Sequence, residues 1–118
     1  MLIYRTYGKE VRLVDEKSIA IMFKALSDEN RVRIVNLLWD GEMSARRLLA
    51  VMSISQSTLS HHMKVLCDSG IIVSRKVGTG MYYKVSVEGV KILQDYLSHL
   101  ARARTICLEK LIYDEPRS

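Results

Sequence analysis

Cysteine and proline are scarce in this sequence of 118 residues, and long apolar runs are absent. Its two cysteines, Cys67 and Cys107, are too few for a disulfide framework and form no Cys-x-x-Cys pair, so we expect no structural zinc site. No apolar run approaches the roughly 20 residues needed to cross a bilayer, and residues 1–10 lack the pattern of a secretion signal. We therefore expect a cytoplasmic protein without a membrane partner.

The sequence also lacks internal repeats, low-complexity tracts and linkers rich in glycine, serine or proline. Its length suits one domain, and its 48% hydrophobic and 26% charged residues are typical of a folded protein. We expect an N-terminal arm over residues 1–14, a single domain over 15–112 and a C-terminal tail over 113–118. The arm has no clean hydrophobic period, so its structure and role stay open.

Features typical of an enzyme are missing as well. Gly78 and Gly80 lie between two β-rich runs and do not open a helix, so they form no phosphate-binding loop. A cluster of serine and histidine over residues 57–62 has no acid beside it that would complete a nucleophile, a base and an orienting carboxylate. We therefore expect neither catalysis nor a cofactor.

What the chain does have is a localised positive charge. The formal net charge is +5, and residues 43–84 carry all of it, with six bases against the single acid Asp68. A basic stripe confined to one segment favours a surface that binds a polyanion, because each Lys or Arg set on a phosphate releases condensed counterions.

Hydrophobic periodicity predicts a mainly α fold with one small β-hairpin. Helices are expected over residues 15–25, 29–40, 45–52, 56–68 and 88–112, and hairpin strands over 71–77 and 81–87. The second helix is expected to start at Ser27 or Asp28, to end at Gly41, and to bury Val32, Val35, Leu38 and Trp39. The last helix has an apolar seam at three- and four-residue steps, which is more than one small domain can bury alone.

Two short helices joined by a tight turn and followed by a basic hairpin are the elements of a winged helix-turn-helix. The helix over 56–68 presents short donors and acceptors outward, as a helix in the major groove of DNA requires. Basic side chains around it can neutralise phosphates, and the small hairpin tip can lie close to the DNA backbone. The predicted contacts with double-stranded DNA are Gln56, Ser57, Thr58, Ser60, His61, Lys64, Arg75, Lys76 and Thr79.

His61 and His62 are adjacent on this predicted recognition helix. Neighbouring residues on an α-helix point about 100° apart, which does not suit two ligands of one metal ion. We expect one imidazole to face DNA and the other to pack.

Three strings in this region carry a family resemblance. They are ALSDENRVRI over 25–34, ISQSTLSHHMKVL over 54–66 and MYYKV over 81–85, and they resemble the second helix, the recognition helix and the wing of ArsR/SmtB-type repressors. The resemblance, which covers about residues 20–100, implies a winged-helix homodimer paired through its first and last helices. It also implies an inverted-repeat operator that is released when an inducer binds. For the dimer interface we expect Ile19, Phe23, Leu93, Leu97 and Leu100.

The two commonest metal sites of that family are not reproduced here. Where its arsenic motif has two cysteines, this chain has Ser44 and Arg46. The four positions of its zinc site on the last helix are Val87, Gly89, Leu100 and Ala103. None of these residues supplies the thiolate, imidazole or carboxylate that such sites require, so we expect no metal at either position.

Other residues are candidates for sensing a signal. Asp95 and His99 lie four residues apart on the last helix and could share a ligand, although such pairs more often make local hydrogen bonds. Cys107 has Arg104 and Lys110 three residues away on either side, and these cations favour a thiolate, although a free cysteine is most often a small buried hydrophobe. A small-molecule or redox inducer therefore stays open.

The sequence leaves two functions to weigh. One is a sequence-specific regulator, and the other is a winged-helix interaction module that has lost specific DNA binding. The basic segment and the polar recognition helix favour the regulator, because a protein-binding derivative has little reason to keep either.

Overall fold

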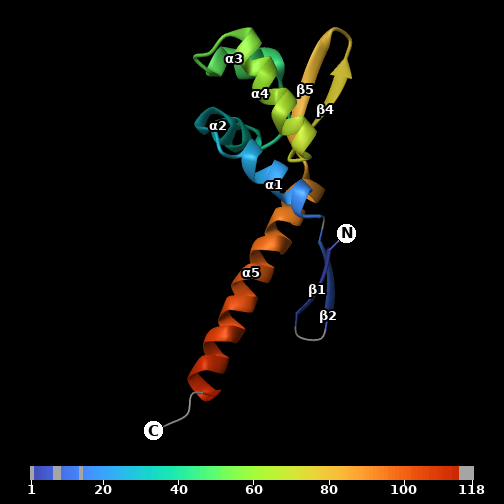
Figure 1. The fold of residues 1–118 in the computed structure, drawn as a ribbon. Helices are drawn as coiled ribbons and strands as arrows, with labels where there is room; N and C mark the ends of the chain where they lie inside the picture. The colour runs from blue at the N-terminus through green and yellow to red at the C-terminus, as the bar shows by residue number, and fades with distance from the viewer. Residues whose placement is uncertain (1, 7–8, 14, 115–118) are drawn as a thin grey trace.

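The computed structural model describes the backbone of residues 2–6, 9–13 and 15–114, and the side-chain surroundings of residues 15–102. The elements in chain order are β1 (Leu2–Thr6), β2 (Lys9–Leu13), α1 (Glu16–Ala25), α2 (Glu29–Leu38), β3 (Met43–Ser44), α3 (Ala45–Val51), α4 (Gln56–Ser69), β4 (Ile72–Val77), β5 (Gly80–Val85) and α5 (Val87–Asp114). Strands β1 and β2 form one antiparallel hairpin, and a second antiparallel sheet has the order β3-β5-β4. The predicted mainly α fold, with a helix-turn-helix and a wing, is confirmed (Figure 1).

Polar side chains fix where the helices begin. Asp15, Asp28, Ser44 and Ser55 each precede a helix and accept a hydrogen bond from the backbone N–H three residues later. These bonds satisfy N–H groups that have no partner within the first helical turn. At the other end of α4, Gly70 takes the left-handed conformation with φ 84°, which glycine adopts without the strain of a Cβ.

The core lies between α1, α2, α3, α4, the start of α5 and the sheet. Its most deeply buried large side chains are Ile34, Leu38, Leu48, Met63, Leu66, Ile71 and Ile72. The expectation for α2 was partly wrong, because Val32 and Trp39 are 40% and 70% exposed while Ile34 is fully buried. The helix also ends at Leu38 and not at Gly41.

A polar cluster explains why the buried side of α2 was misjudged. Arg31 of α2 turns inward, where its Nε donates to the carbonyl of Ala25 at 2.7 Å and its Nη1 lies 3.1 Å from Nδ1 of His62. Asp28 lies 4.0 Å from the other ring nitrogen of His62. This cluster ties α1, α2 and α4 together, so the inner side of α2 contains a charged residue and its periodicity is blurred.

The wing is joined to the helix-turn-helix through β3. Strands β4 and β5 pair from Ile72↔Val85 to Val77↔Gly80, which leaves a two-residue turn. On its other edge β5 pairs with β3 at two positions, Met43↔Tyr83 and Ser44↔Tyr82. Because Ser44 is also the cap of α3, the wing and the helix-turn-helix share a strand.

The α5 helix leaves this core and runs away from it, with the β1–β2 hairpin alongside (Figure 1). At its start, Ser86 donates its backbone N–H to the carbonyl of Ile71 at 2.8 Å, and its hydroxyl accepts from Gly89 N–H at 3.1 Å. A Cβ at Gly89 would lie 2.0 Å from the carbonyl oxygen of Gly70. The end of α4 and the start of α5 are therefore in direct backbone contact. Within the described part of the chain, none of the helices has the length and apolar character that crossing a membrane requires.

Candidate nucleic-acid interface

The outward side of α4 is polar and open to solvent. The predicted base-reading residues on it are all exposed, namely Gln56, Ser57, Ser60 and His61. Thr58 is exposed too, but its hydroxyl accepts a hydrogen bond from the Ser55 hydroxyl at 2.8 Å and its N–H donates to the same oxygen at 3.2 Å. Thr58 therefore belongs to the cap of the helix. The Ser57 hydroxyl also lies 3.2 Å from that of Ser55, while Gln56, Ser60 and His61 present donors and acceptors over the first two turns.

The two adjacent histidines lie in different environments. His62 is only 6% exposed and sits in the polar cluster with Arg31, while His61 is exposed. The predicted division between one packing histidine and one outward histidine is therefore seen in the geometry. Contact between His61 and DNA stays a prediction.

Basic side chains flank this helix on the wing and on α4 itself. Lys76 of β4 and Lys84 of β5 are exposed, and Thr79 lies in the turn between the two strands. Lys64 forms an ion pair with Asp68 one helical turn away, with Nζ and Oδ2 3.0 Å apart and both side chains largely exposed. Such exposed helix pairs contribute about 0.3–0.5 kcal/mol, so a phosphate can replace the carboxylate at little cost.

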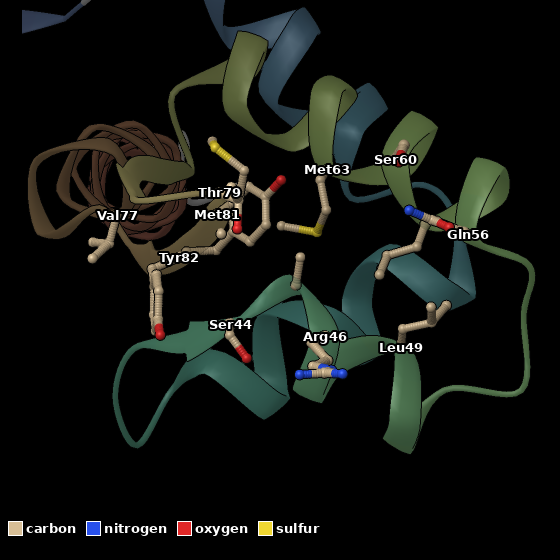
Figure 2. A pocket seen from close by; sticks show the side chains of 14 residues that line it. Ser44, Arg46, Leu49, Gln56, Ser60, Met63, Val77, Thr79, Met81 and Tyr82 are labelled. Carbon is tan, nitrogen blue, oxygen red and sulfur yellow. The ribbon is translucent and has the colours of Figure 1, made fainter.

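A groove of 690 Å³ separates α4 from the wing, and α3 forms its third side. Figure 2 shows Gln56, Ser60 and Met63 of α4 on one side, Arg46 and Leu49 of α3 on another, and Thr79, Met81 and Tyr82 of the wing on the third. Three of the residues that line the groove are predicted DNA contacts, namely Gln56, Ser60 and Thr79. The rest of its lining includes apolar side chains and Arg46. Its mixed lining suits a sugar-phosphate strand, which has apolar sugar faces and charged oxygens.

Arg75 of the wing has a protein partner. Its Nε and Nη2 donate to the two carboxylate oxygens of Glu42 at 2.7 and 2.6 Å, and its guanidinium lies 5.3 Å from the ring centre of Tyr82. The hydrogen bonds from Arg75 and, more weakly, the charge of Lys84 lower the pKa of the Glu42 carboxyl, and the same carboxylate raises the pKa of Arg75. Arg75 was predicted to contact phosphate, and here two of its five N–H donors are engaged by Glu42.

The prediction of the site omitted three charged residues. Arg46 and Arg47 are exposed at the start of α3, next to the groove. The sequence offered a signal for them, because both lie in the basic segment and directly follow the Ser44 cap. Glu42 gave no such signal, since its partner Arg75 is 33 residues away along the chain.

The residues expected at a dimer interface divide into two groups. Ile19 and Leu93 are 6% and 8% exposed, so they are already buried within one chain. The other three are exposed, with 41% for Phe23, 51% for Leu97 and 47% for Leu100. Phe23 also makes an edge-to-face contact with Tyr96, with the two ring centroids 6.0 Å apart. The exposed group leaves an apolar surface on α1 and α5, which stays a prediction for the interface.

Two of the candidate sensing residues, Asp95 and His99, lie one turn apart on α5. Asp95 forms an ion pair with Lys91 at 3.7 Å, and His99 is half-buried. Cys107 lies outside the residues whose side chains are described. Burial raises the pKa of the Cys67 thiol, so this residue has little thiolate character. Across residues 15–102, His, Cys, Asp and Glu form no group of three that could hold a metal ion.

Comparison with known proteins agrees with this geometry. Residues 28–74 match the family model described as bacterial regulatory protein, arsR family. The arsenical resistance operon repressor of Staphylococcus aureus is 39% identical over 84 residues, which cover 71% of this chain and 78% of that protein.

Solved structures share the fold. The ArsR-like transcriptional regulator from Rhodococcus sp. RHA1 superposes with a TM-score of 0.70 at 26% identity, covering 81% of this chain and 92% of that one. A homodimeric winged helix-turn-helix DNA-binding domain from Mycobacterium bovis has a TM-score of 0.59 at 20% identity, covering 86% and 88% of the two chains. The second likeness supports the fold alone.

Proposed function

Because the chain belongs to the arsR family of bacterial regulatory proteins, we propose that it is a homodimeric cytoplasmic repressor that binds an inverted-repeat operator. It is a DNA-binding transcriptional regulator and not an enzyme. The operator, the dimer and the signal are the parts that we propose. We assign all three to the domain proposed over residues 15–112, with the arm before it and the tail after it, although α5 continues to Asp114.

One observation carries the proposal for DNA. An exposed polar helix face, with Gln56, Ser57, Ser60 and His61, adjoins the groove and the basic wing. Short side chains of this kind form hydrogen bonds with base edges in the major groove, while cations around them bind phosphates. We assign base contacts to these four residues and phosphate contacts to Lys64 and Lys76, with Thr79 at the wing tip close to the backbone. Thr58 supports the helix start.

The test begins with selection of bound sequences from a random duplex library. On the selected operator, Ser57→Ala or His61→Ala should each cost about 1–3 kcal/mol and relax specificity at one position. Lys76→Ala should weaken binding to all duplexes alike. It should also reduce the salt slope, which is the slope of the logarithm of the binding constant against the logarithm of the salt concentration, by about 1 in magnitude. If the protein prefers no duplex over random DNA at about 150 mM salt, the proposal fails and the interaction module replaces it.

The exposed apolar residues on α1 and α5 support the homodimer. Three apolar side chains stay exposed on a single chain, namely Phe23, Leu97 and Leu100. A second copy presents the same apolar surface, so two copies can cover it for each other. Paired helices would place two recognition helices about 34 Å apart, one turn of the duplex. Leu97→Asp should give monomers in light scattering, whereas Gln94→Asp at an exposed polar position of the same helix should not. An unchanged dimer for Leu97→Asp would mean that the interface lies elsewhere.

The signal is proposed to act outside the two commonest metal sites of the family. Ser44, Arg46, Val87 and Gly89 occupy positions of those sites and are not suitable ligands. Zn(II) should therefore not release the operator through them. A release titration with metals, arsenite, peroxide and persulfide tests this on the wild type and on Cys107→Ser. Release by micromolar Zn(II) would contradict the proposal and redirect attention to Asp95 and His99, and release by an oxidant that Cys107→Ser abolishes would identify a cysteine sensor.

A further inference from the structure

A cluster of three side chains spans the three-stranded sheet. Glu42 directly precedes β3, Tyr82 lies on the central strand β5, and Arg75 lies on the edge strand β4. The guanidinium of Arg75 makes two hydrogen bonds with the carboxylate of Glu42 and lies over the ring of Tyr82. Arg75 and Tyr82 are opposite each other in the β4–β5 register. The two outer strands are thus joined across the middle one.

This contact reinforces a short backbone connection. The wing is attached to the chain before α3 by only two paired positions, Met43↔Tyr83 and Ser44↔Tyr82. A bidentate arginine-carboxylate pair has a fixed planar geometry, so it restricts rotation between the groups that it joins more than a lysine pair does. The side chains of Arg75 and Glu42 are 60% and 27% exposed, so the pair lies on the outer surface of the sheet and not in the core.

Glu42 also offsets the charge of a second cation. Lys84 is diagonal to Arg75 on the same face of the β4–β5 pair, and its charge acts on Glu42 as well. Like charges at neighbouring positions on one sheet face destabilise the pairing. Without the carboxylate, Arg75 and Lys84 would repel each other across the wing.

We propose that Glu42 is a positioning residue for DNA binding, which holds Arg75 over Tyr82 and so fixes the wing relative to α3 and α4. The inference rests on the proposed function. Tyr82 also lines the groove between the wing and α4, so the position of the wing sets the width of that groove. In this role Arg75 acts mainly through Glu42, whose carboxylate offsets its charge.

The alternative is purely electrostatic and predicts the opposite sign. An acid near a DNA-binding surface repels phosphates, so its removal would tighten binding. If Glu42 positions the wing, its removal weakens binding to the operator although the protein gains one positive charge. The sign of the change therefore separates the two explanations.

The experiment compares Glu42→Gln, Arg75→Gln and the double variant, with Asp40→Asn as the control. Asp40 is an exposed acid two residues before Glu42, so its replacement changes the charge equally without touching Arg75. We expect Glu42→Gln to weaken operator binding about 5-fold, the double variant to bind no more weakly than Arg75→Gln, and Asp40→Asn to stay within about 2-fold of the wild type. Arg75→Gln should leave the salt slope unchanged, in contrast to Lys76→Ala. Circular dichroism and thermal unfolding check that each variant is folded.

Three results would overturn the inference: tighter binding by Glu42→Gln, a double variant that regains wild-type affinity, or a salt slope for Arg75→Gln that falls by about 1. In each of these cases the residues act by charge alone. Failure of the proposed function is distinguishable, because the wild type would then show no operator preference before any variant is compared.

Discussion

The helix-turn-helix with its wing and the α5 helix differ in how they bury apolar side chains. In the first region Leu48, Leu66 and Ile72 are at most 1% exposed. On α5, Leu97 and Leu100 are about half exposed, at 51% and 47%. The first region therefore supplies most of the core and presents polar groups outward, whereas α5 adds Leu93 to that core and leaves other apolar groups exposed along its length.

The largest effect should come from removing a core side chain of the first region. Leu66 on α4 is 0% exposed, so Leu66→Ala should lower the free energy of unfolding by about 2–5 kcal/mol through lost burial and a cavity. Leu97→Ala removes the same atoms from a half-exposed site and should act chiefly on dimer formation. Urea unfolding at several protein concentrations measures both. If both variants lose the same free energy of unfolding at every protein concentration, the two regions do not differ in this way.

The next effect concerns the place where the two regions meet. Gly89→Ala would bring a Cβ to 2.0 Å from the carbonyl oxygen of Gly70, and backbone atoms on both sides must then move. We expect a loss of about 1–3 kcal/mol or more in the free energy of unfolding. Gly80→Ala is the control, since its Cβ would make only ordinary contacts at 3.5 Å and beyond. A Gly89→Ala protein as stable as Gly80→Ala would show that the junction adapts easily.

A smaller contrast separates two neighbours on α4. His62→Ala would leave the inward guanidinium of Arg31 without one of its partners, at an expected cost of about 1–3 kcal/mol. His61→Ala should change stability by less than about 0.5 kcal/mol, because His61 is exposed. Thermal unfolding and operator binding, measured on both variants, should give opposite rankings. The same ranking in both measurements would contradict the assignment of one histidine to packing and one to DNA.

Acid should weaken the same polar cluster. A hydrogen bond from the backbone N–H of Arg31 lowers the pKa of Asp28 from its ordinary 3.8, and the charge of His62 acts in the same direction. A lowered pKa in the folded state stabilises the protein above the unfolded value, and this contribution is lost as the pH falls through the folded value. Asp28→Asn should therefore show a smaller loss of stability between pH 5 and pH 2 than the wild type in urea titrations. Identical pH profiles would show that Asp28 contributes nothing through its charge.

The smallest effect is expected at Cys67. Burial raises the pKa of its thiol and the charge of Asp68 raises it further, so little thiolate is present at neutral pH. In the folded protein, iodoacetamide should modify Cys67 far more slowly than it modifies a free thiol peptide, and unfolding in urea should remove the difference. Rapid modification of the native protein at Cys67, located by mass spectrometry, would contradict the expected inertness.

Local signals made much of the first region predictable. Ser44 and Gly70 mark the start of α3 and the end of α4 by chemistry within a few residues, and the structure has both boundaries there. The paired strands of the wing follow from β-rich runs on either side of two glycines. The exposed polar residues of α4 were likewise visible, because a helix shows its outward side as a periodic pattern.

What could not be predicted depends on contacts distant in sequence. Arg31 turns inward, where its guanidinium meets His62, a residue 31 positions away that the local pattern of α2 does not indicate. The two-residue strand β3 exists only through its pairing with β5, and Glu42 gains its role only from a partner 33 residues away. No local pattern encodes such partners.

Because α5 is long, a small shift at the backbone contact between Gly70 and Gly89 moves the far end of the helix much further. A helix of 28 residues is about 42 Å long, and Gly89 lies in its first turn. A tilt of about 5° at that end displaces the other end by about 4 Å, close to the rise of three residues along the helix axis. A shift of a few tenths of an ångström at Gly89 therefore corresponds to a displacement of several ångströms at the far end of the helix.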